Sequence, residues 1–334
     1  MKVLPLLTVA GIFALGASGG MSAPPVPLRA THEVVKTIHT GPSAAGLAFA
    51  ARTGFLYVTN IFGDNISVIN PRTRLVVDTV PLVGGNICAH PFGLGYDKKH
   101  NIIYVACQQF TAATAIDAGT NTPIGDPIEV GSSPFGIAYD ERNGDVYIAI
   151  AHDNVVTVVD GGTRRVIDHI PVGEAPFGIA YDGRRGFLYV TNSQSDTVSI
   201  IDGATNEVVG TVPVAPGQPA GLASMGIAYD GRNDTIYVAN FGGSTVSVID
   251  ARTRELVSEV FVGGGPFGIA LNERDGNIYV PTFFDGTVDV IDGNTNLDVE
   301  SIPVGPSPVW AAADPRTGHV WVTHGDAVSE LAAR

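Results

Sequence analysis

The chain has 334 residues, of which 45% are apolar, and it contains 41 glycines and 22 prolines. That glycine and proline content is high for a helical protein, and no stretch shows the period of an amphipathic helix. Its 19 basic and 33 acidic residues give a net charge of −14, which argues against nucleic acids and anionic membranes as partners, because both repel an acidic protein.

The first residues have the layout of a secretory signal peptide. Lys2 precedes a short apolar run that is followed by small residues, and this run is too short for a good membrane-spanning helix. We therefore expect a signal peptide over 1–23, cleaved near Ala17 or Ala23, and an extended linker over 24–30. The mature protein is expected to be a periplasmic or extracellular monomer without a membrane span, in a compartment where disulfides persist.

Residues 31–334 repeat a pattern of four short segments, with a period of about 42 residues. The segments follow the patterns GIAYD, LYVTN, TVSVID and VVxTVPVG. Each alternates apolar and polar residues and ends in turn-forming residues, which predicts four strands, named A to D. In every unit an aromatic residue follows the strand A position by eleven residues, as Tyr57 follows Gly46 and Trp321 follows Trp310. Four short antiparallel strands per unit predict an all-β propeller.

The last unit is incomplete and the first strand completes it. The seventh unit begins near Trp310 and the chain ends after its strand C. Residues 31–41 align with the strand D of another unit, 253–263. We therefore predict a seven-bladed propeller whose last blade is closed by the N-terminal strand, which leaves only short sheet edges.

The strand B sequences carry a resemblance to a known family. Residues 57–60 and 189–192 read YVTN and residues 237–240 read YVAN, so 31–334 resembles the YVTN-type β-propeller repeat family. The resemblance implies a secreted or surface-layer propeller that binds or scaffolds, and it brings no shared catalytic set. The chain also has no P-loop, dinucleotide fingerprint, nucleophile elbow or His-Glu-x-x-His motif.

Several prominent residues recur in most units, which favours structural roles for them. The aspartates after strands A and C are expected to form Asx-type turns. The strand B tyrosines are expected in the core. The phenylalanines before the strand A glycine are expected to pack between blades rather than bind a ligand. These phenylalanines are Phe92, Phe135, Phe177 and Phe267.

Charge is divided between the two faces of the predicted ring. The D–A and B–C connections share one face, which we name the top, and the A–B and C–D turns share the bottom. Of the 18 basic residues beyond Lys2, 15 lie in bottom turns, which we interpret as solvated turns, with docking of an anionic partner as the alternative. The top connections contain no Lys or Arg and hold these acidic residues: Asp64, Asp153, Glu174, Asp196, Asp285 and Asp326. Such a face suits a cation, a metal or a neutral ligand better than a phosphate or carboxylate.

Two D–A connections, 84–92 and 214–225, are longer than the others and are expected to face each other across the central opening. Loops that depart from a rigid repeat often carry binding function. We therefore predict a ligand site on the top face. The candidate ligand-binding residues are His90, His152, Glu174 and His324.

Both cysteines belong to the second unit. Cys88 lies in the first long loop, and Cys107 ends strand B, where we expect it opposite Phe92. A disulfide is the favoured interpretation in an oxidising compartment. The alternative is a copper or zinc site with Cys88, His90 and Cys107 as ligands. No other cofactor is predicted.

Together these observations predict a binding module that recognises an unknown small ligand or protein through its top face. One alternative is a lactonase-like or metal-assisted hydrolase that uses top-face carboxylates with His90. A third class is an accessory to a periplasmic oxidoreductase or metal-handling system.

Overall fold

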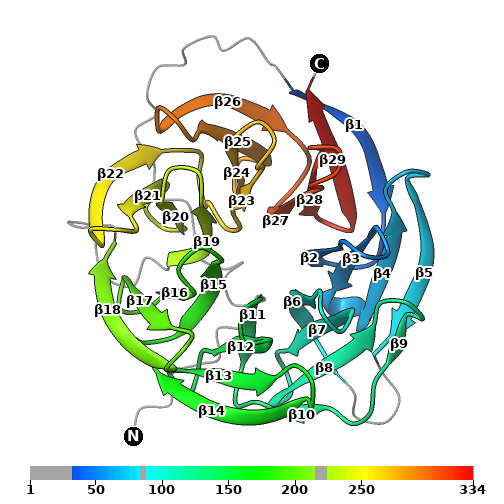
Figure 1. Cartoon of the computed structure of the whole chain (residues 1–334). Helices are drawn as coiled ribbons and strands as arrows, with labels where there is room; N and C mark the ends of the chain where they lie inside the picture. The colour runs from blue at the N-terminus through cyan, green and yellow to red at the C-terminus, as the bar shows by residue number, and fades with distance from the viewer. Residues whose placement is uncertain (1–31, 83–87, 215–223, 334) are drawn as a thin grey trace, which may run out of the picture.

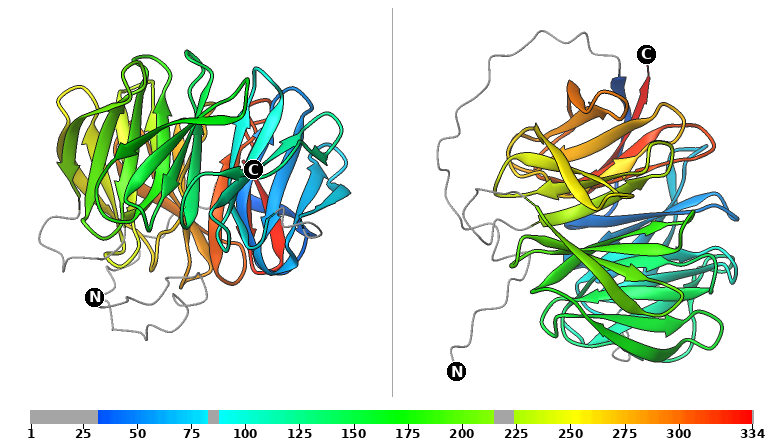
Figure 2. Two further views of the ribbon diagram at one scale, coloured as in Figure 1. Left: turned by 90° about the horizontal axis from the view of Figure 1, so that it is seen from below. Right: turned by 60° about the vertical axis from the view of Figure 1, so that its left-hand side comes forward.

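The structure is a computed structural model, which describes residues 32–82, 88–214 and 224–333. Seven antiparallel sheets surround a central axis (Figure 1), and they form a short cylinder in side view (Figure 2). This confirms the predicted all-β seven-bladed propeller. The expected signal peptide, the linker and parts of both long loops, 83–87 and 215–223, lie outside the described residues.

The strands follow one another blade by blade, from the axis outward. Blade 1 comprises β2 (Ala44–Ala50), β3 (Phe55–Asn60), β4 (Asn65–Asn70) and β5 (Leu75–Pro81), with a short 3₁₀ turn η1 (Ile61–Gly63) after β3. Blade 2 comprises β6 (Pro91–Asp97), β7 (Ile102–Cys107), β8 (Ala112–Asp117), β9 (Thr122–Pro123) and β10 (Ile128–Glu129). Blade 3 comprises β11 (Pro134–Tyr139), β12 (Asp145–Ile150), β13 (Val155–Asp160) and β14 (Arg165–Pro171).

The remaining blades have the same order. Blade 4 comprises β15 (Pro176–Asp182), β16 (Phe187–Asn192), β17 (Thr197–Asp202) and β18 (Glu207–Pro213). Blade 5 comprises β19 (Ser224–Asp230), β20 (Thr235–Asn240), β21 (Thr245–Asp250) and β22 (Glu255–Phe261). Blade 6 comprises β23 (Ala270–Leu271), β24 (Asn277–Thr282), β25 (Thr287–Asp292) and β26 (Leu297–Pro303). Blade 7 comprises β27 (Pro308–Ala313), β28 (Val320–His324), β29 (Ala327–Ala333) and β1 (His32–His39).

The N-terminal strand closes the ring as predicted. β1 pairs antiparallel with β29, from His32 opposite Ala333 to His39 opposite Ala327 (Figure 1). The ring of His32 also bonds to blade 6, through Nδ1 to Glu300 Oε2 at 2.7 Å and through Nε2 to the Tyr279 hydroxyl at 2.9 Å. These contacts tie the first described residue to the neighbouring blade.

Most innermost strands carry a β-bulge that the sequence spacing does not reveal. In blade 2 the register moves by one residue between Pro91 and Leu94, so that Cys107 lies opposite Pro91. The expectation that Cys107 pairs with Phe92 was therefore wrong, because a bulge sets two residues of one strand against one of its partner.

Close approach of the innermost strands explains the repeated glycine. A Cβ on Gly268 would lie 2.6 Å from the carbonyl oxygen of Val309 in the next blade, and one on Gly226 would lie 2.6 Å from that of Phe267. The N–H groups of both glycines donate to those same carbonyls at 2.8 Å. A side chain at these positions would push neighbouring blades apart.

The threonine of YVTN makes an equivalent link between blades. The hydroxyl of Thr191 accepts the Gly178 N–H at 2.8 Å and donates to the Met225 carbonyl of the next blade at 2.8 Å. Thr59 and Thr323 form the same bridge. The repeated threonine therefore contributes hydrogen bonds that join neighbouring blades.

The strand B tyrosines are buried, which confirms that they belong to the core. The hydroxyls of four of them, Tyr57, Tyr104, Tyr147 and Tyr237, also reach the C–D turn of the following blade. Tyr147 donates to Asn206 Oδ1 at 2.8 Å, and Tyr237 donates to Asn296 Oδ1 at 2.7 Å. These bonds join neighbouring blades at the bottom face.

Candidate functional site

The phenylalanines before the strand A glycines meet on the central axis. Phe135 and Phe177 have ring centroids 4.5 Å apart, and Phe92 lies 5.7 Å from Phe177 and 6.2 Å from Phe267. All four are buried. They belong to the core and pack against one another between blades, as predicted, although Phe92 and Phe267 also line a cavity. The same cluster contains Ala45, Met225 and Val309. Because the contacts run across the ring as well as between neighbours, these side chains form a plug in the central opening.

A cavity of about 260 Å³ lies above this plug, and all of its walls come from the top face and the plug. Phe92 and Phe267 line it from the plug, and Phe62 and Phe283 line it from the ends of the B–C hairpins. On the other side of the plug, the strand A glycines and Trp310 line a space of about 40 Å³. Of these two spaces among the described residues, the upper cavity is the one with room for a ligand larger than a few atoms.

Polar groups at the cavity come mainly from two D–A loops and one hairpin tip. Ser43, Ser307 and Asp326 line it, and Asp326 is the one ionisable side chain among its described lining residues. Its Oδ1 accepts the Ser43 N–H at 2.9 Å. Phe62 stays 52% exposed beside the cavity. The cavity is thus apolar and aromatic inside and has a single carboxylate among its lining.

Four of the six acidic residues of the top face make the same contact, in which the carboxylate at a hairpin tip accepts a backbone N–H of a D–A loop. The donor–acceptor pairs are His90 N to Asp64 Oδ1 at 2.8 Å, Ser132 N to Asp153 Oδ2 at 2.8 Å, Gly264 N to Asp285 Oδ2 at 2.6 Å and Ser43 N to Asp326 Oδ1 at 2.9 Å. These hydrogen bonds hold the four carboxylates in fixed positions on the top face.

The predicted ligand-binding residues occupy different environments. The His90 ring lies edge-on to the Phe62 ring at 5.6 Å, next to the cavity. His152 and Glu174 are exposed in top connections of blades 3 and 4. His324 is buried, and its Nε2 bonds to Ser329 Oγ at 2.8 Å. Burial lowers the pKa of His324.

His324 takes the position of the YVTN asparagine in blade 7. In blade 4 that asparagine, Asn192, donates to Ser199 Oγ at 2.9 Å, as Asn240 does to Ser247 Oγ in blade 5. The bond from His324 to Ser329 is the counterpart of these contacts. A structural role thus accounts for the position of His324.

Sequence reasoning missed Phe62, Phe283 and Asp326 as a group. A signal was present, because several B–C hairpin tips carry phenylalanine where others have only polar residues, as in IFGD and FFDG. Spacing along the chain could not show that the tips of blades 1, 6 and 7 share one cavity.

The two cysteines form a disulfide, as predicted, with a Cα–Cα distance of 5.1 Å. Both are buried. A cystine sulfur is not a thiolate, so Cys88 and Cys107 in this state are not the soft anionic ligands that the copper or zinc alternative requires. Within the described residues, no group of three or more His, Cys, Asp or Glu side chains is arranged to hold a metal ion.

On the bottom face, basic residues link each blade to the next. Arg232 donates to the Gly276 carbonyl at 2.7 Å, Arg274 to that of Arg316 at 2.8 Å, and Arg316 to that of Gly54 at 3.1 Å. The other links are Arg52 to Lys99, Arg142 to Arg184, Arg184 to Gly231 and the ion pair of Lys98 with Glu141. We name these links the bottom belt.

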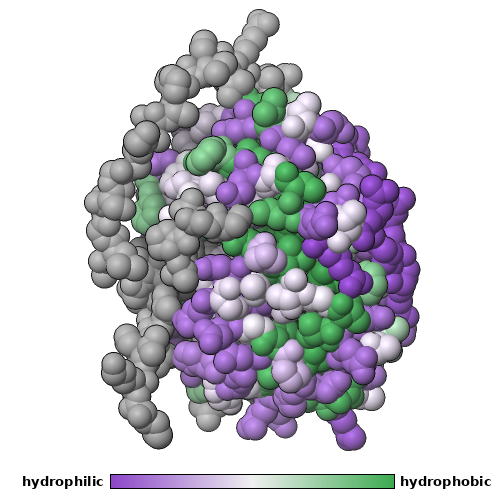
Figure 3. All heavy atoms as spheres, turned by 90° about the vertical axis from the view of Figure 1, so that its left-hand side faces the viewer, coloured by the Kyte–Doolittle hydropathy of each residue, from purple (hydrophilic) through white to green (hydrophobic). Residues whose placement is uncertain are grey.

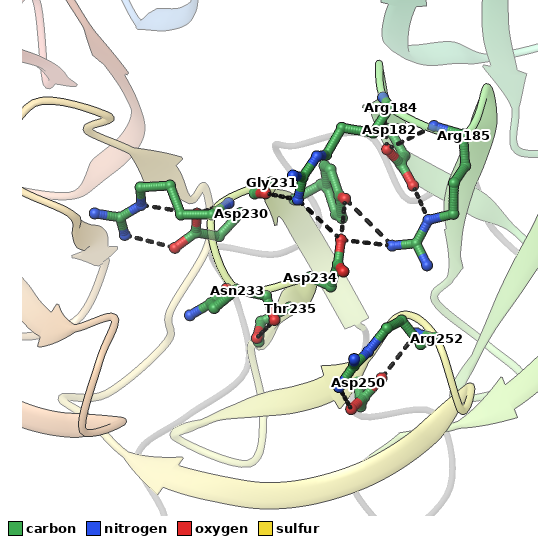
Figure 4. Close-up of polar contacts among 12 residues, drawn as sticks. Asp182, Arg184, Arg185, Asp230, Gly231, Asn233, Asp234, Thr235, Asp250 and Arg252 are labelled. Carbon is green, nitrogen blue, oxygen red and sulfur yellow. Dashed lines mark hydrogen bonds and ion pairs between the residues drawn. The ribbon is translucent and has the colours of Figure 1, made fainter.

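Aspartates of the A–B turns hold arginines of the bottom face in place. Arg232 also pairs with Asp230 at 2.5 Å, and Arg185 lies between Asp182 and Asp234 at 2.8 Å from each (Figure 4). Backbone N–H groups bond to Asp182 and Asp230, as the predicted Asx-type turns require. The belt gives the bottom arginines a structural role, and it leaves less positive charge free for an anionic partner.

The outer wall of the ring carries exposed apolar side chains. Val208, Val209, Val257 and Phe261 are exposed on the outer strands β18 and β22, and apolar patches interrupt the polar surface on that side (Figure 3). They lie at the sheet edges and are separate from the cavity lining.

Comparison with known proteins supports the fold. No family model and no curated protein matches the chain. Among solved structures, a chain of Kuenenia stuttgartiensis hydrazine synthase is similar, with a TM-score of 0.77 and 16% sequence identity. The match covers 89% of this chain and 97% of that chain. At this identity the likeness shows the propeller fold alone. Among the described residues, no helix has the length and apolar character needed to cross a membrane.

Proposed function

We propose that this protein is a binding module that receives a small ligand in the top-face cavity. One observation carries the proposal: the cavity of about 260 Å³ is lined by four phenylalanines together with other apolar residues, and it has a few polar groups. Ligand sites are typically concave, mainly apolar, and equipped with a few polar groups that orient the ligand. The buried plug provides a preformed floor, so little conformational order has to be gained on binding.

The hydrolase alternative has less support at this cavity. Acyl transfer and lactone hydrolysis need a general base or nucleophile next to the substrate, or a metal that activates water. The polar side chains that line the cavity are Ser43, Ser307 and Asp326. The Asp326 carboxylate is already bonded to a loop N–H, and no histidine is among the described lining residues. This set is better suited to orienting a ligand than to proton transfer.

The proposal also covers the family and the cellular compartment of the protein. We propose that the chain is a secreted or periplasmic member of the YVTN-type propellers. The YVTN segments at 57–60 and 189–192 support the family, and the inter-blade bridges made by Thr59 and Thr191 give those residues a physical reason. The buried disulfide supports an oxidising compartment.

A titration with a neutral apolar probe tests the proposed site. Toluene is added to the protein while tryptophan emission is recorded, because the Trp310 ring lies 6.4 Å from the Phe92 ring of the plug. We expect saturable 1:1 binding that Phe62→Ala weakens about fivefold or more, since that phenyl ring is part of the wall. Phe110→Ala is the matched control, because Phe110 is also exposed in a B–C connection but does not line the cavity. Equal affinity of the two variants would refute the site.

A further inference from the structure

We propose that the top-face cavity selects small organic cations, in particular alkylated ammonium groups on a short apolar body. This inference rests on the proposed function and adds the charge and class of the ligand. It combines two properties of the same place, aromatic walls and a negative field without opposing positive charge.

The aromatic walls suit a weakly hydrated cation. Phe62, Phe92, Phe267 and Phe283 all line the cavity, and Phe62 is half exposed while the others are buried. The faces of aromatic rings attract cations within about 6 Å, and quaternary ammonium groups are recognised in this way. Their methyl groups also bury apolar surface, so the same walls favour the body of the ligand and its charge.

The charge of the top face has one sign. Its connections carry six acidic residues and no lysine or arginine in the sequence. Four of the carboxylates are fixed by backbone N–H groups. Clefts that collect charge of one sign raise the local concentration of oppositely charged ligands. Asp326 is at the cavity itself, and the single hydrogen bond at its Oδ1 leaves acceptor capacity for a cation.

The same features exclude other ligand classes. A phosphate or carboxylate would find no arginine or lysine to hold it. A divalent metal requires several oxygen or nitrogen ligands, whereas the described lining offers one carboxylate. Size is compatible with the proposal, because a cavity of about 150 Å³ can hold benzene and this cavity measures about 260 Å³.

The test compares two probes of the same shape. Choline carries a quaternary ammonium group, and 3,3-dimethylbutan-1-ol is its neutral carbon isostere. Binding is measured by calorimetry at low and high sodium chloride. We expect choline to bind about tenfold more tightly or better at low salt, with a smaller advantage at about 0.5 M salt because the field is screened. Acetate is expected not to bind.

Two matched substitutions separate the charge from the fold. Asp326→Asn keeps an acceptor oxygen for the Ser43 N–H and removes the charge at the cavity. We expect it to weaken choline about fivefold and to leave the neutral alcohol unchanged. Asp153→Asn alters the same type of hairpin-tip contact in blade 3, away from the cavity lining, and should change choline binding less than twofold.

The outcomes distinguish the two proposals. If the neutral alcohol binds as tightly as choline and Phe62→Ala weakens both, the selection for cations is wrong and the binding site stands. If Asp326→Asn weakens both probes equally, the residue acts on the fold and the charge argument fails. If neither probe binds and toluene binding is insensitive to Phe62→Ala, both proposals are wrong.

Discussion

Removal of the disulfide is a direct test of how the first long loop is held. Cys88 lies in the loop that precedes blade 2, and Cys107 is the last residue of β7 in that blade, 19 residues further along the chain. The perturbation is the double substitution Cys88→Ala and Cys107→Ala. Alanine is chosen because both positions are buried, where a serine hydroxyl would lack a guaranteed partner.

The magnitude follows from loop entropy. In the chain-entropy model, a cross-link over about 20 residues removes about 11 cal/mol/K from the unfolded chain, which corresponds to about 3 kcal/mol at 25 °C. The structure describes nearly the whole propeller, for which unfolding entropy near the midpoint is on the order of 0.6 kcal/mol/K. The double variant should therefore melt about 5 °C below the oxidised protein.

The assay is differential scanning calorimetry of the oxidised protein and the double variant. Two controls accompany it: wild-type protein unfolded in the presence of reductant, which should melt close to the double variant, and mass spectrometry of denatured wild type, which should gain about 2 Da on reduction. A midpoint for the double variant within about 1 °C of the oxidised protein would refute the reasoning. It would mean that packing around β6 and β7 holds the loop without the bond.

Three further predictions concern stability. Arg274→Ala breaks one link of the bottom belt and should lower the free energy of unfolding in urea by about 1 kcal/mol. Arg72→Ala, on an exposed turn outside the belt, should change that free energy by less than about 0.5 kcal/mol. Equal effects of the two substitutions would contradict a stabilising role for the belt. Gly268→Ala places a Cβ 2.6 Å from a carbonyl oxygen of the next blade and should cost about 3 kcal/mol or more, while Gly162→Ala, with its nearest neighbour at 3.5 Å, should be tolerated in the same assay. Burial raises the pKa of Asp298 to about 7. The folded pKa then exceeds the unfolded value, so protonated Asp298 contributes to folding stability below about pH 4, and this contribution is lost as the pH rises through about 7. Relative to Asp298→Asn, the wild type should lose about 1–2 kcal/mol of unfolding free energy between pH 4 and 8. Parallel pH profiles of stability for the two proteins would contradict the raised pKa.

The sequence determined the architecture because each blade is a local unit. Four strands per repeat, the invariant spacing from strand A to strand B and the split seventh unit were all readable along the chain. The pairing of β1 with β29 followed from completing the last unit. The disulfide followed from two cysteines in one blade and an expected oxidising compartment.

Contacts across the ring were decided only by the tertiary structure. The plug of Phe92, Phe177 and Phe267 joins blades 2, 4 and 6, and the bottom belt depends on how closely neighbouring turns approach. The sequence shows which residue types repeat in the plug and in the belt, but it does not show which of them come into contact. The bulge that moved the partner of Cys107 is likewise a backbone irregularity without a spacing signature.

The candidate site shows the same division. The sequence located the top face and its negative charge, because alternating strand direction sorts the connections into two sets. It could not bring Phe62, Phe283 and Asp326 together, since 264 residues of chain separate the first from the last. Only closure of the ring places their hairpins around one axis, and the local patterns that fix strands and turns carry no information about which tips will meet there.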